Sequence, residues 1–303
     1  MGQTKLQFDP QYPLYTSDAT GWRTDQLVQV LDRLYEQRKP IVFFVHGRGI
    51  EPQKSLRGAK FTQGLAVAKL ELGYDVRVLM FNWDSAFRPP AFWDRSRPLS
   101  NIPQGAASLG SVLAALGLYR ARHSATPAPV MLVHSMGSIV VQHCVASGRW
   151  PLGPSLFTQL VLTQPDADDR DHADWLDHLA RRERVYVTLN RDDWVLKKST
   201  DDRPEGVQAL GLGTSQRLAA HARYIDLSNM GALGNADDDH EVFGKGAMNG
   251  QLHVCQFFQQ ALRGETVVLD PELNVDRRER EVVYHLKSQH EPHSPCLQML
   301  APK

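Results

Sequence analysis

Residues 133–137, Val-His-Ser-Met-Gly, have the order of a nucleophile elbow, the sharp turn that exposes a catalytic serine between a strand and a helix. The apolar residues 130–133 lead into Ser135, and a helix-like segment begins at Gly137. A serine hydroxyl is a weak nucleophile, so it needs a neighbouring base and donors for the oxyanion that its attack creates. The sequence therefore predicts nucleophilic chemistry at Ser135, with the other groups supplied by loops elsewhere.

A second turn, from His46 to Gly49, follows the apolar residues 41–45. Glycines on both sides of Arg48 allow a bound group to approach the backbone closely. We expect the N–H groups of Arg48 and Met136 to form the oxyanion hole, each donor contributing roughly 3 to 4 kcal/mol of transition-state stabilisation. We interpret His46, which precedes the turn, as structural.

The elements that must position these groups alternate between strands and helices, which is typical of an α/β fold with a mostly parallel sheet covered on both faces. The predicted strands are residues 41–45, 76–81, 130–133, 159–163, 184–189, 223–227, 266–269 and 281–286. The predicted helices are residues 25–37, 56–72, 106–122, 137–147, 173–182 and 250–262. Ligands of such a sheet bind at the carboxyl ends of its strands, so the loops there should carry the remaining catalytic residues.

Three aspartates are candidates for the acid that orients the base. Asp193 is preferred, because it follows the predicted strand 184–189 and precedes the candidate histidine, as the order serine, acid, histidine requires. Asp192 would take this role instead if the loop were one residue longer or shorter. Asp166 is the third candidate, because it follows the preceding predicted strand, residues 159–163. Capping a helix is the ordinary role of an aspartate in such a loop.

His240 is the candidate base, because it lies in a long irregular stretch after the last core strand, whereas His221 flanks a strand and His253 lies in a helix. A neutral imidazole there would accept the Ser135 proton and return it to the leaving group. The three aspartates at 237–239 should raise the pKa of His240, so that activity falls at acidic pH.

The Asp- and His-rich residues 166–178 allow an alternative, metal-dependent interpretation. Asp171, Asp174 and His178 have spacings that place them near one face of a helix. Acidic residues are also common at helix starts, and no strict ligand motif is present. We therefore expect a solvated helix start, no metal and no cofactor.

The composition of the 303-residue chain indicates one globular domain. Its 34 basic and 34 acidic residues leave no formal net charge, which does not favour a nucleic-acid partner. No apolar run approaches the ~18 residues that span a bilayer, and residues 1–13 lack a signal-peptide pattern, so we expect a cytoplasmic protein without stable membrane insertion. The three cysteines lack metal-ligand spacing and do not indicate a disulfide framework, which fits a reducing compartment.

Two further segments stand apart from the predicted elements. Residues 84–104 are rich in proline and aromatic residues, too broken for a regular element, and we interpret them as a substrate-facing flap. Residues 288–303 are interpreted as a loose tail.

Several motifs occur in an order that resembles the α/β-hydrolase superfamily over roughly residues 40 to 250. They are His46-Gly47, Phe81-Asn82-Trp83-Asp84-Ser85, His134-Ser135-Met136-Gly137, Pro165-Asp166-Ala167-Asp168, Asp193-Trp194-Val195-Leu196 and His240. The chain is most similar to a family of uncharacterised, mainly bacterial, esterase/lipase-like α/β hydrolases known as a domain of unknown function. It departs from the family pattern at Val133, where the elbow has glycine, and at Asp84, where the family has proline.

The resemblance implies an α/β-hydrolase fold and a serine hydrolase that acts on a small-molecule acyl ester through an acyl-enzyme. Ser135, Asp193 and His240 would form its triad. The alternatives are a noncatalytic binding protein on the same fold and a metal-dependent hydrolase that uses residues 166–178, since a fold does not dictate an activity.

Overall fold

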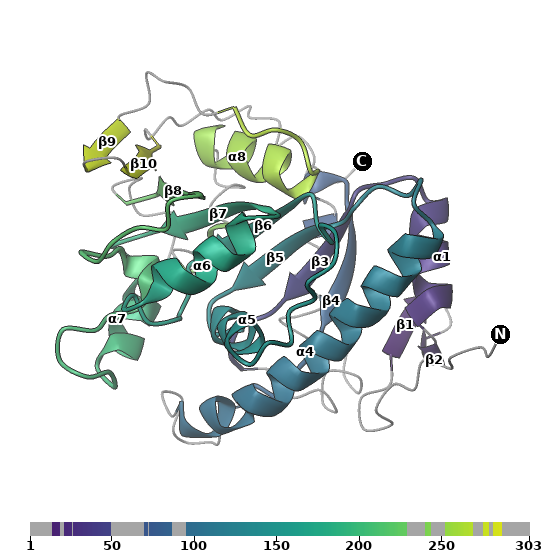
Figure 1. The fold of residues 1–303 in the computed structure, drawn as a ribbon, viewed down its shortest axis with the longest axis horizontal. Helices are drawn as coiled ribbons and strands as arrows, with labels where there is room; N and C mark the ends of the chain where they lie inside the picture. Colours follow the sequence, from purple (N-terminus) through teal and green to yellow (C-terminus); the bar gives the residue numbers. More distant parts are fainter. Residues whose placement is uncertain are drawn as a thin grey trace.

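An eight-stranded sheet forms the centre of the protein (Figure 1). The computed structural model describes residues 14–18, 21–25, 27–49, 70–71, 73–86, 95–228, 240–243, 252–268, 275–278 and 281–286. The strands of the sheet are β3 (Ile41–Val45), β4 (Arg77–Phe81), β5 (Val130–His134), β6 (Gln159–Thr163), β7 (Arg184–Leu189), β8 (Ala222–Asp226), β9 (Val275–Arg278) and β10 (Glu281–His285). Their spatial order is β4-β3-β5-β6-β7-β8-β10-β9. All neighbours pair in parallel except β9 and β10, so the predicted α/β class with a mostly parallel sheet is confirmed.

Helices cover both faces of this sheet, as predicted. The helices are α1 (Leu27–Glu36), α4 (Ser96–Arg122), α5 (Gly137–Ala146), α6 (His172–Ala180), α7 (Trp194–Thr200) and α8 (Leu252–Leu262), and a short 3-10 helix η1 covers Leu210–Leu212. Alternate strand residues enter two separate cores: Phe43 packs with residues of α1, α4, α5 and α6, whereas Phe44 packs with residues of α8. Because β3, β5 and β6 are buried at every position, their sequences are continuous apolar runs rather than alternating ones.

The longest helix, α4, corrects the predicted flap at residues 84–104. It begins at Ser96 rather than near residue 106, so the second half of the predicted flap is helical, while residues 87–94 lie outside the described residues. Pro98 is tolerated because it lies in the first turn, where backbone N–H groups have no acceptor within the helix. Pro103 lies inside the helix, where proline normally breaks it, yet Ile102 beside it is buried in the core. Tertiary packing therefore outweighs the local cost of proline here.

α4 is also, among the described residues, the one helix long and apolar enough to cross a bilayer. It meets this criterion by the average hydropathy of its most apolar window, whereas the expectation from the sequence concerned uninterrupted apolar runs of ~18 residues. Half of the most apolar window of α4 is buried inside the protein, and the helix packs against α5. Its apolar character is explained by this core position.

Other differences from the predicted elements lie near the chain ends. The expected strand at residues 266–269 is not formed at 266–268, its described part, although Val267 is buried in the core near α8; β9 pairs with β10 instead. The hairpin of β1 (Leu14–Asp18) and β2 (Gly21–Asp25) was not predicted, nor was α7. Only the end of the expected helix at 56–72 is described, and the expected tail at 288–303 lies outside the described residues.

The cysteines differ in state. Cys144 in α5 is free and buried, whereas Cys255 in α8 is disulfide-bonded. No disulfide framework is expected from the sequence, and the spacing of the three cysteines contains no signal for this single bond.

Candidate active site

The predicted elbow lies at the carboxyl end of β5, in the middle of the sheet. Ser135 has a φ of 51°, in the left-handed region that side chains other than glycine rarely adopt. A hydrogen bond of 3.2 Å from its N–H to the carbonyl of Thr163 fixes this turn to the end of β6. α5 begins two residues later at Gly137. The sharp turn between strand and helix explains how the hydroxyl of Ser135 is presented at the edge of the sheet.

Two glycines allow the turn after β3 to lie directly against the elbow. A Cβ atom on Gly137 would lie 2.8 Å from the carbonyl oxygens of both Val45 and His46. A Cβ atom on Gly47 would lie 2.8 Å from the Cβ of Ser135. Val133, which replaces the first glycine of the elbow pattern, is fully buried within β5. The close contact is thus made by glycines at other positions.

Ser135, His240 and Asp193 form a continuous hydrogen-bonded chain, although they come from three loops. The Oγ of Ser135 donates to Nε2 of His240 at 3.0 Å, and Nδ1 of His240 donates to Oδ2 of Asp193 at 2.7 Å. All three residues are buried. The structure therefore brings together the three side chains predicted to be nucleophile, base and acid, hydrogen-bonded in the sequence that a catalytic triad requires.

Asp193 has a second contact that fixes its orientation. Its Oδ1 accepts a hydrogen bond of 3.0 Å from the N–H of Leu196, so the side chain caps the N-terminus of α7 while Oδ2 faces His240. The sequence presented helix capping and orientation of the candidate base as competing roles for this aspartate. In the structure, one carboxylate oxygen caps the helix and the other contacts His240. The neighbouring Asp192 is exposed.

The third candidate acid, Asp166, is close to the elbow but engaged elsewhere. Its N–H donates to the carbonyl of Ser135 at 3.1 Å. Its buried carboxylate accepts hydrogen bonds from Arg95 and Arg203, each at 2.9 Å. The charges of Arg95 and Arg203 hold its pKa below the ordinary value despite the opposing effect of burial.

The protonation of His240 is set by opposing effects. Burial lowers the pKa of its imidazole, but the charge and hydrogen bond of Asp193 and the charges of Asp166 and Glu241 together raise it. The pKa of His240 therefore lies above its ordinary value, in the predicted direction. The predicted contribution of the aspartates at 237–239 falls on residues outside the described ones.

His134 is a residue of the site that sequence reasoning missed. Its Nε2 donates to the carbonyl oxygen of His240 at 3.0 Å, and the two rings lie 4.8 Å apart. Burial and the nearby His240 lower the pKa of His134 well below its ordinary value, so its ring is neutral. Phe243 also packs edge-on against this ring. His134 thus holds the backbone that carries the candidate base.

The predicted oxyanion donors lie on the two turns that meet at the elbow. Met136 is the residue before the first turn of α5, where a backbone N–H has no acceptor within the helix. Arg48 lies beside Gly49, whose N–H is anchored to the carbonyl of Ser85 at 2.9 Å. His46 is buried, stacks on the ring of Trp83 and has a pKa lowered to about 4 by burial, which agrees with the predicted structural role.

The segment proposed as an alternative metal site is engaged in other contacts. Within the described residues there is no cluster of three or more His, Cys, Asp or Glu side chains suited to a metal ion. Asp174 forms an ion pair with Arg217 at 2.7 Å. His172, which begins α6, is buried and contacts the hydroxyl of Tyr224. Residues 172–178 thus lie in α6, whereas Asp166, Asp169 and His172 are buried rather than solvated as expected.

Comparison with known proteins adds no family assignment. Searches against protein-family models, curated proteins and solved structures found no match to this chain.

Proposed function

We propose that this chain is a serine hydrolase with the α/β-hydrolase fold, in one domain, and that it cleaves a carboxylic ester or a related acyl compound. The observation that carries the proposal is the hydrogen-bonded chain from Ser135 through His240 to Asp193. The strained backbone of Ser135 adds support, because strain of this kind is concentrated at functional sites. The resemblance of the ordered motifs to esterase/lipase-like α/β hydrolases supports the same reaction class.

In the first half of the reaction, the Oγ of Ser135 attacks the carbonyl carbon of the ester while its proton moves to Nε2 of His240. The N–H groups of Met136 and Arg48 donate to the oxyanion of the tetrahedral intermediate. Asp193 stays ionised and stabilises the imidazolium through Nδ1. The intermediate then expels the alcohol, which takes the proton from His240 and leaves the acyl group on Ser135.

In the second half, a water molecule attacks the acyl-enzyme. His240 takes a proton from this water, and a second tetrahedral intermediate forms in the same oxyanion hole. Its collapse breaks the bond to Oγ, returns the proton to Ser135 and releases the carboxylic acid. The reaction needs no cofactor.

The decisive experiment is covalent labelling with a fluorophosphonate, together with hydrolysis of p-nitrophenyl esters of graded chain length. We expect the wild-type protein to be labelled and active, and the Ser135→Ala variant to be neither. The matched control is Ser147→Ala, which removes an exposed serine at the end of α5. We expect this variant to be labelled like the wild-type protein.

Two results would reject the proposal. A wild-type protein that is neither labelled nor active would favour the noncatalytic binding protein. Ester hydrolysis that a chelator abolishes and that persists in Ser135→Ala would favour the metal-dependent alternative.

A cytoplasmic location stays a prediction. The disulfide at Cys255 argues against it, because disulfides are rare in reducing compartments.

A further inference from the structure

The backbone carbonyl of Ser135 accepts hydrogen bonds from three donors. They are the N–H of Ser138 at 3.0 Å, the Oγ of Ser138 at 2.7 Å and the N–H of Asp166 at 3.1 Å. A carbonyl oxygen has two lone pairs, so three donors are more than its hydrogen-bonding capacity requires. Ser135, Ser138 and Asp166 are all buried. Two separate parts of the chain therefore hold this carbonyl in one direction.

The same peptide group carries a proposed oxyanion donor. The carbonyl of Ser135 and the N–H of Met136 belong to one peptide bond, which is planar and trans, so they point in opposite directions. Donors that hold the oxygen therefore also set the direction of this N–H. Hydrogen bonds to the oxygen polarise the peptide group as well, which makes its N–H a stronger donor. Helix α5 does not use this N–H, because Met136 is the residue before its first turn.

The hydroxyl of Ser138 joins the elbow to the loop after β6. It donates to the carbonyl of Ser135 and accepts a hydrogen bond of 2.9 Å from the N–H of Ala167. The N–H of Ser135 also donates to the carbonyl of Thr163 at 3.2 Å. Residues 163–167 thus contact both the N–H and the carbonyl of the elbow serine, and the side chain of Ser138 adds a third contact.

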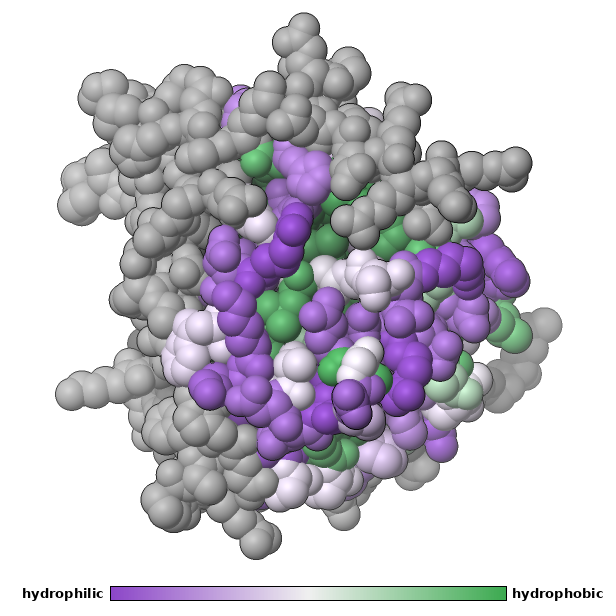
Figure 2. All heavy atoms as spheres, turned by 90° about the vertical axis from the view of Figure 1, so that its left-hand side faces the viewer, coloured by the Kyte–Doolittle hydropathy of each residue, from purple (hydrophilic) through white to green (hydrophobic). Residues whose placement is uncertain are grey.

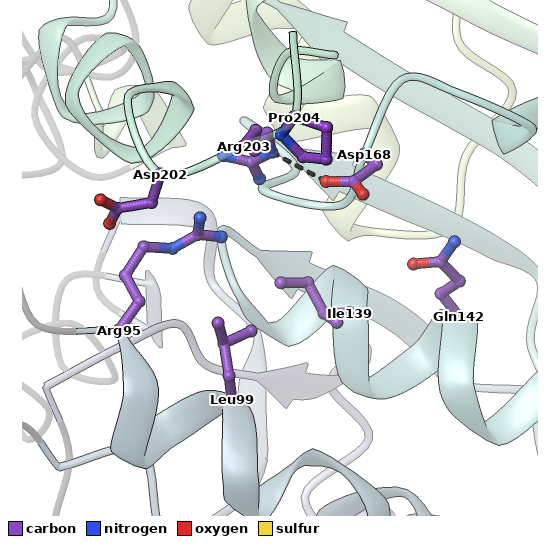
Figure 3. A pocket seen from close by; sticks show the side chains of 8 residues that line it. All are labelled: Arg95, Leu99, Ile139, Gln142, Asp168, Asp202, Arg203 and Pro204. Carbon is purple, nitrogen blue, oxygen red and sulfur yellow. Dashed lines mark hydrogen bonds and ion pairs between the residues drawn. The ribbon is translucent and has the colours of Figure 1, made fainter.

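The loop after β6 is itself fixed by buried charges. The carboxylate of Asp166 accepts a hydrogen bond of 2.6 Å from the Oγ of Ser199. It also accepts from Arg95 and from Arg203, each at 2.9 Å. Figure 3 shows these two arginines at the edge of a pocket of about 220 Å³, with Arg203 bonded to Asp168. The start of α4 and the end of α7 therefore keep the loop in place.

The chain itself buries these supporting groups. The side chains of Arg95 and Arg203 are only 7% and 3% exposed. The molecular face on the side of α6 and α7 is mostly hydrophilic where its atoms are coloured, with only small hydrophobic patches (Figure 2). Such a face does not favour a partner protein that would cover the network. The support of the elbow is therefore in place before any ligand or partner binds.

We infer that Ser138 is a positioning residue for the oxyanion hole. Its hydroxyl locks the peptide group between Ser135 and Met136, so that the N–H of Met136 faces the developing oxyanion without rearrangement. A donor that is oriented in advance needs no reorganisation during the reaction. The bond of Ser138 is to the backbone oxygen of Ser135, so this side chain acts through the peptide group and not on the substrate. The role rests on the proposed function.

The first test is hydrolysis of the best p-nitrophenyl ester by the full-length Ser138→Ala variant. Removal of a whole oxyanion donor lowers kcat by about 10²- to 10³-fold. Ser138→Ala keeps the N–H of Met136 but loosens it, so we expect a smaller fall in kcat, about tenfold. KM should be unchanged, because the oxyanion exists only in the transition state and the tetrahedral intermediate.

A mimic of the tetrahedral intermediate gives a readout that a merely structural role would not change. The probe is an alkyl trifluoromethyl ketone with the chain length of the best ester, and the methyl ketone of the same chain is its unreactive counterpart. The Oγ of Ser135 bonds to the carbonyl carbon of the probe, its proton passes to Nε2 of His240, and the π electrons move to the oxygen, which becomes an oxyanion. We expect Ser138→Ala to raise the inhibition constant of the trifluoromethyl ketone about tenfold and to leave that of the methyl ketone unchanged.

Two further variants control the experiment. Ser147→Ala is the matched control, because the Oγ of Ser147 makes the same kind of bond at the other end of α5, to the carbonyl of His143 at 2.7 Å. It should keep the wild-type kcat and both inhibition constants. Ser138→Cys replaces the hydroxyl by a thiol, which is a weak donor, and it decides the question if Ser138→Ala does not fold. We expect its kcat to fall about threefold or more, with KM unchanged.

The outcomes separate this inference from the proposed function. A folded Ser138→Ala protein with wild-type kcat and wild-type affinity for the trifluoromethyl ketone would overturn the positioning role, and so would equal weakening of both ketones. Wild-type kcat in Ser138→Cys would have the same meaning if Ser138→Ala does not fold. In these cases an active wild-type enzyme leaves the proposed function standing. A wild-type protein that is neither labelled nor active rejects the proposed function, and the positioning role falls with it.

Discussion

Replacing Asp193 by asparagine separates its two structural roles. The amide oxygen of asparagine can still accept from the N–H of Leu196, where Oδ1 now accepts at 3.0 Å, so the cap of α7 is kept. The amide nitrogen would face Nδ1 of His240, where Oδ2 now accepts at 2.7 Å. A donor at this place favours the tautomer whose proton is on Nε2, and that nitrogen can then no longer accept the Ser135 proton.

The expected loss follows from this change of tautomer. We expect kcat to fall about 10⁴-fold, equivalent to about 5 kcal/mol of transition-state stabilisation. The melting temperature of Asp193→Asn should stay close to that of the wild type. Asp193→Ala should lose the same activity and also the cap, which is worth about 1 kcal/mol, or roughly 2 °C of melting temperature for a chain of this size.

The pH profile gives an independent readout of Asp193→Asn. Only neutral His240 can accept the Ser135 proton, so kcat/KM of the wild type should fall as the pH drops through a pKa above 6.5. Asparagine removes the charge that raises this pKa, while burial still lowers it, so the acid limb should move to lower pH.

The assay is hydrolysis of the best p-nitrophenyl ester between pH 5 and 9, with thermal melting of each variant. Asp192→Asn is the matched control, because Asp192 is adjacent and exposed, and it should keep wild-type activity. The reasoning is refuted if Asp193→Asn keeps activity within about threefold, or about 0.7 kcal/mol of barrier, while its melting temperature is unchanged.

Three further substitutions test the elbow and its support. Ser135→Gly should abolish ester hydrolysis. It should also raise the free energy of unfolding by about 1 kcal/mol, because glycine adopts a φ of 51° without strain. Denaturant titrations measure this change, and a lower unfolding midpoint than that of the wild type would contradict it. His134→Phe keeps a ring but removes the donor to the carbonyl of His240. We expect kcat to fall roughly tenfold, equivalent to about 1.4 kcal/mol of barrier, with KM unchanged. A change in KM alone would indicate a role in binding instead. Gly137→Ala should destabilise the protein by about 1 to 3 kcal/mol, measured by the same titrations, because its Cβ would lie 2.8 Å from the carbonyl of Val45; a neutral effect would mean that β3 moves away easily.

The central strands and the convergence at their carboxyl ends were predictable from the sequence. β3, β6 and β7 begin and end at the predicted residues, because apolar runs between helical segments have few other interpretations. Parallel strands place all their following loops at one edge, so Ser135, Asp193 and His240 could be expected to meet without knowledge of distances.

The choice between neighbouring aspartates depended on local geometry instead. The N–H of Asp192 is held by the side chain of Asn190 at 3.0 Å, and the N–H of Asp193 by the carbonyl of the same residue at 3.2 Å. This turn directs Asp193 inward and leaves Asp192 exposed. A sequence pattern contains both residues but not the dihedral angles that separate them.

Contacts between distant residues were not predictable. His134 donates a hydrogen bond to the carbonyl of His240, which lies 106 positions away in the chain. Other donor side chains of similar length could make the same bond, so the residue type alone does not predict it. Arg95 and Arg203 meet at Asp166 from 71 and 37 positions away along the chain. Such contacts depend on packing that local propensity does not contain.

The dual contact of Asp193 couples a folding event to chemical competence. When the first turn of α7 opens, the N–H of Leu196 becomes free to exchange with solvent, and the carboxylate loses the restraint that directs its other oxygen toward His240. The exchange rate of this single amide hydrogen therefore reports how often the cap that orients the carboxylate is open. Under the proposed function, it reports the fraction of molecules in which Asp193 is oriented toward His240.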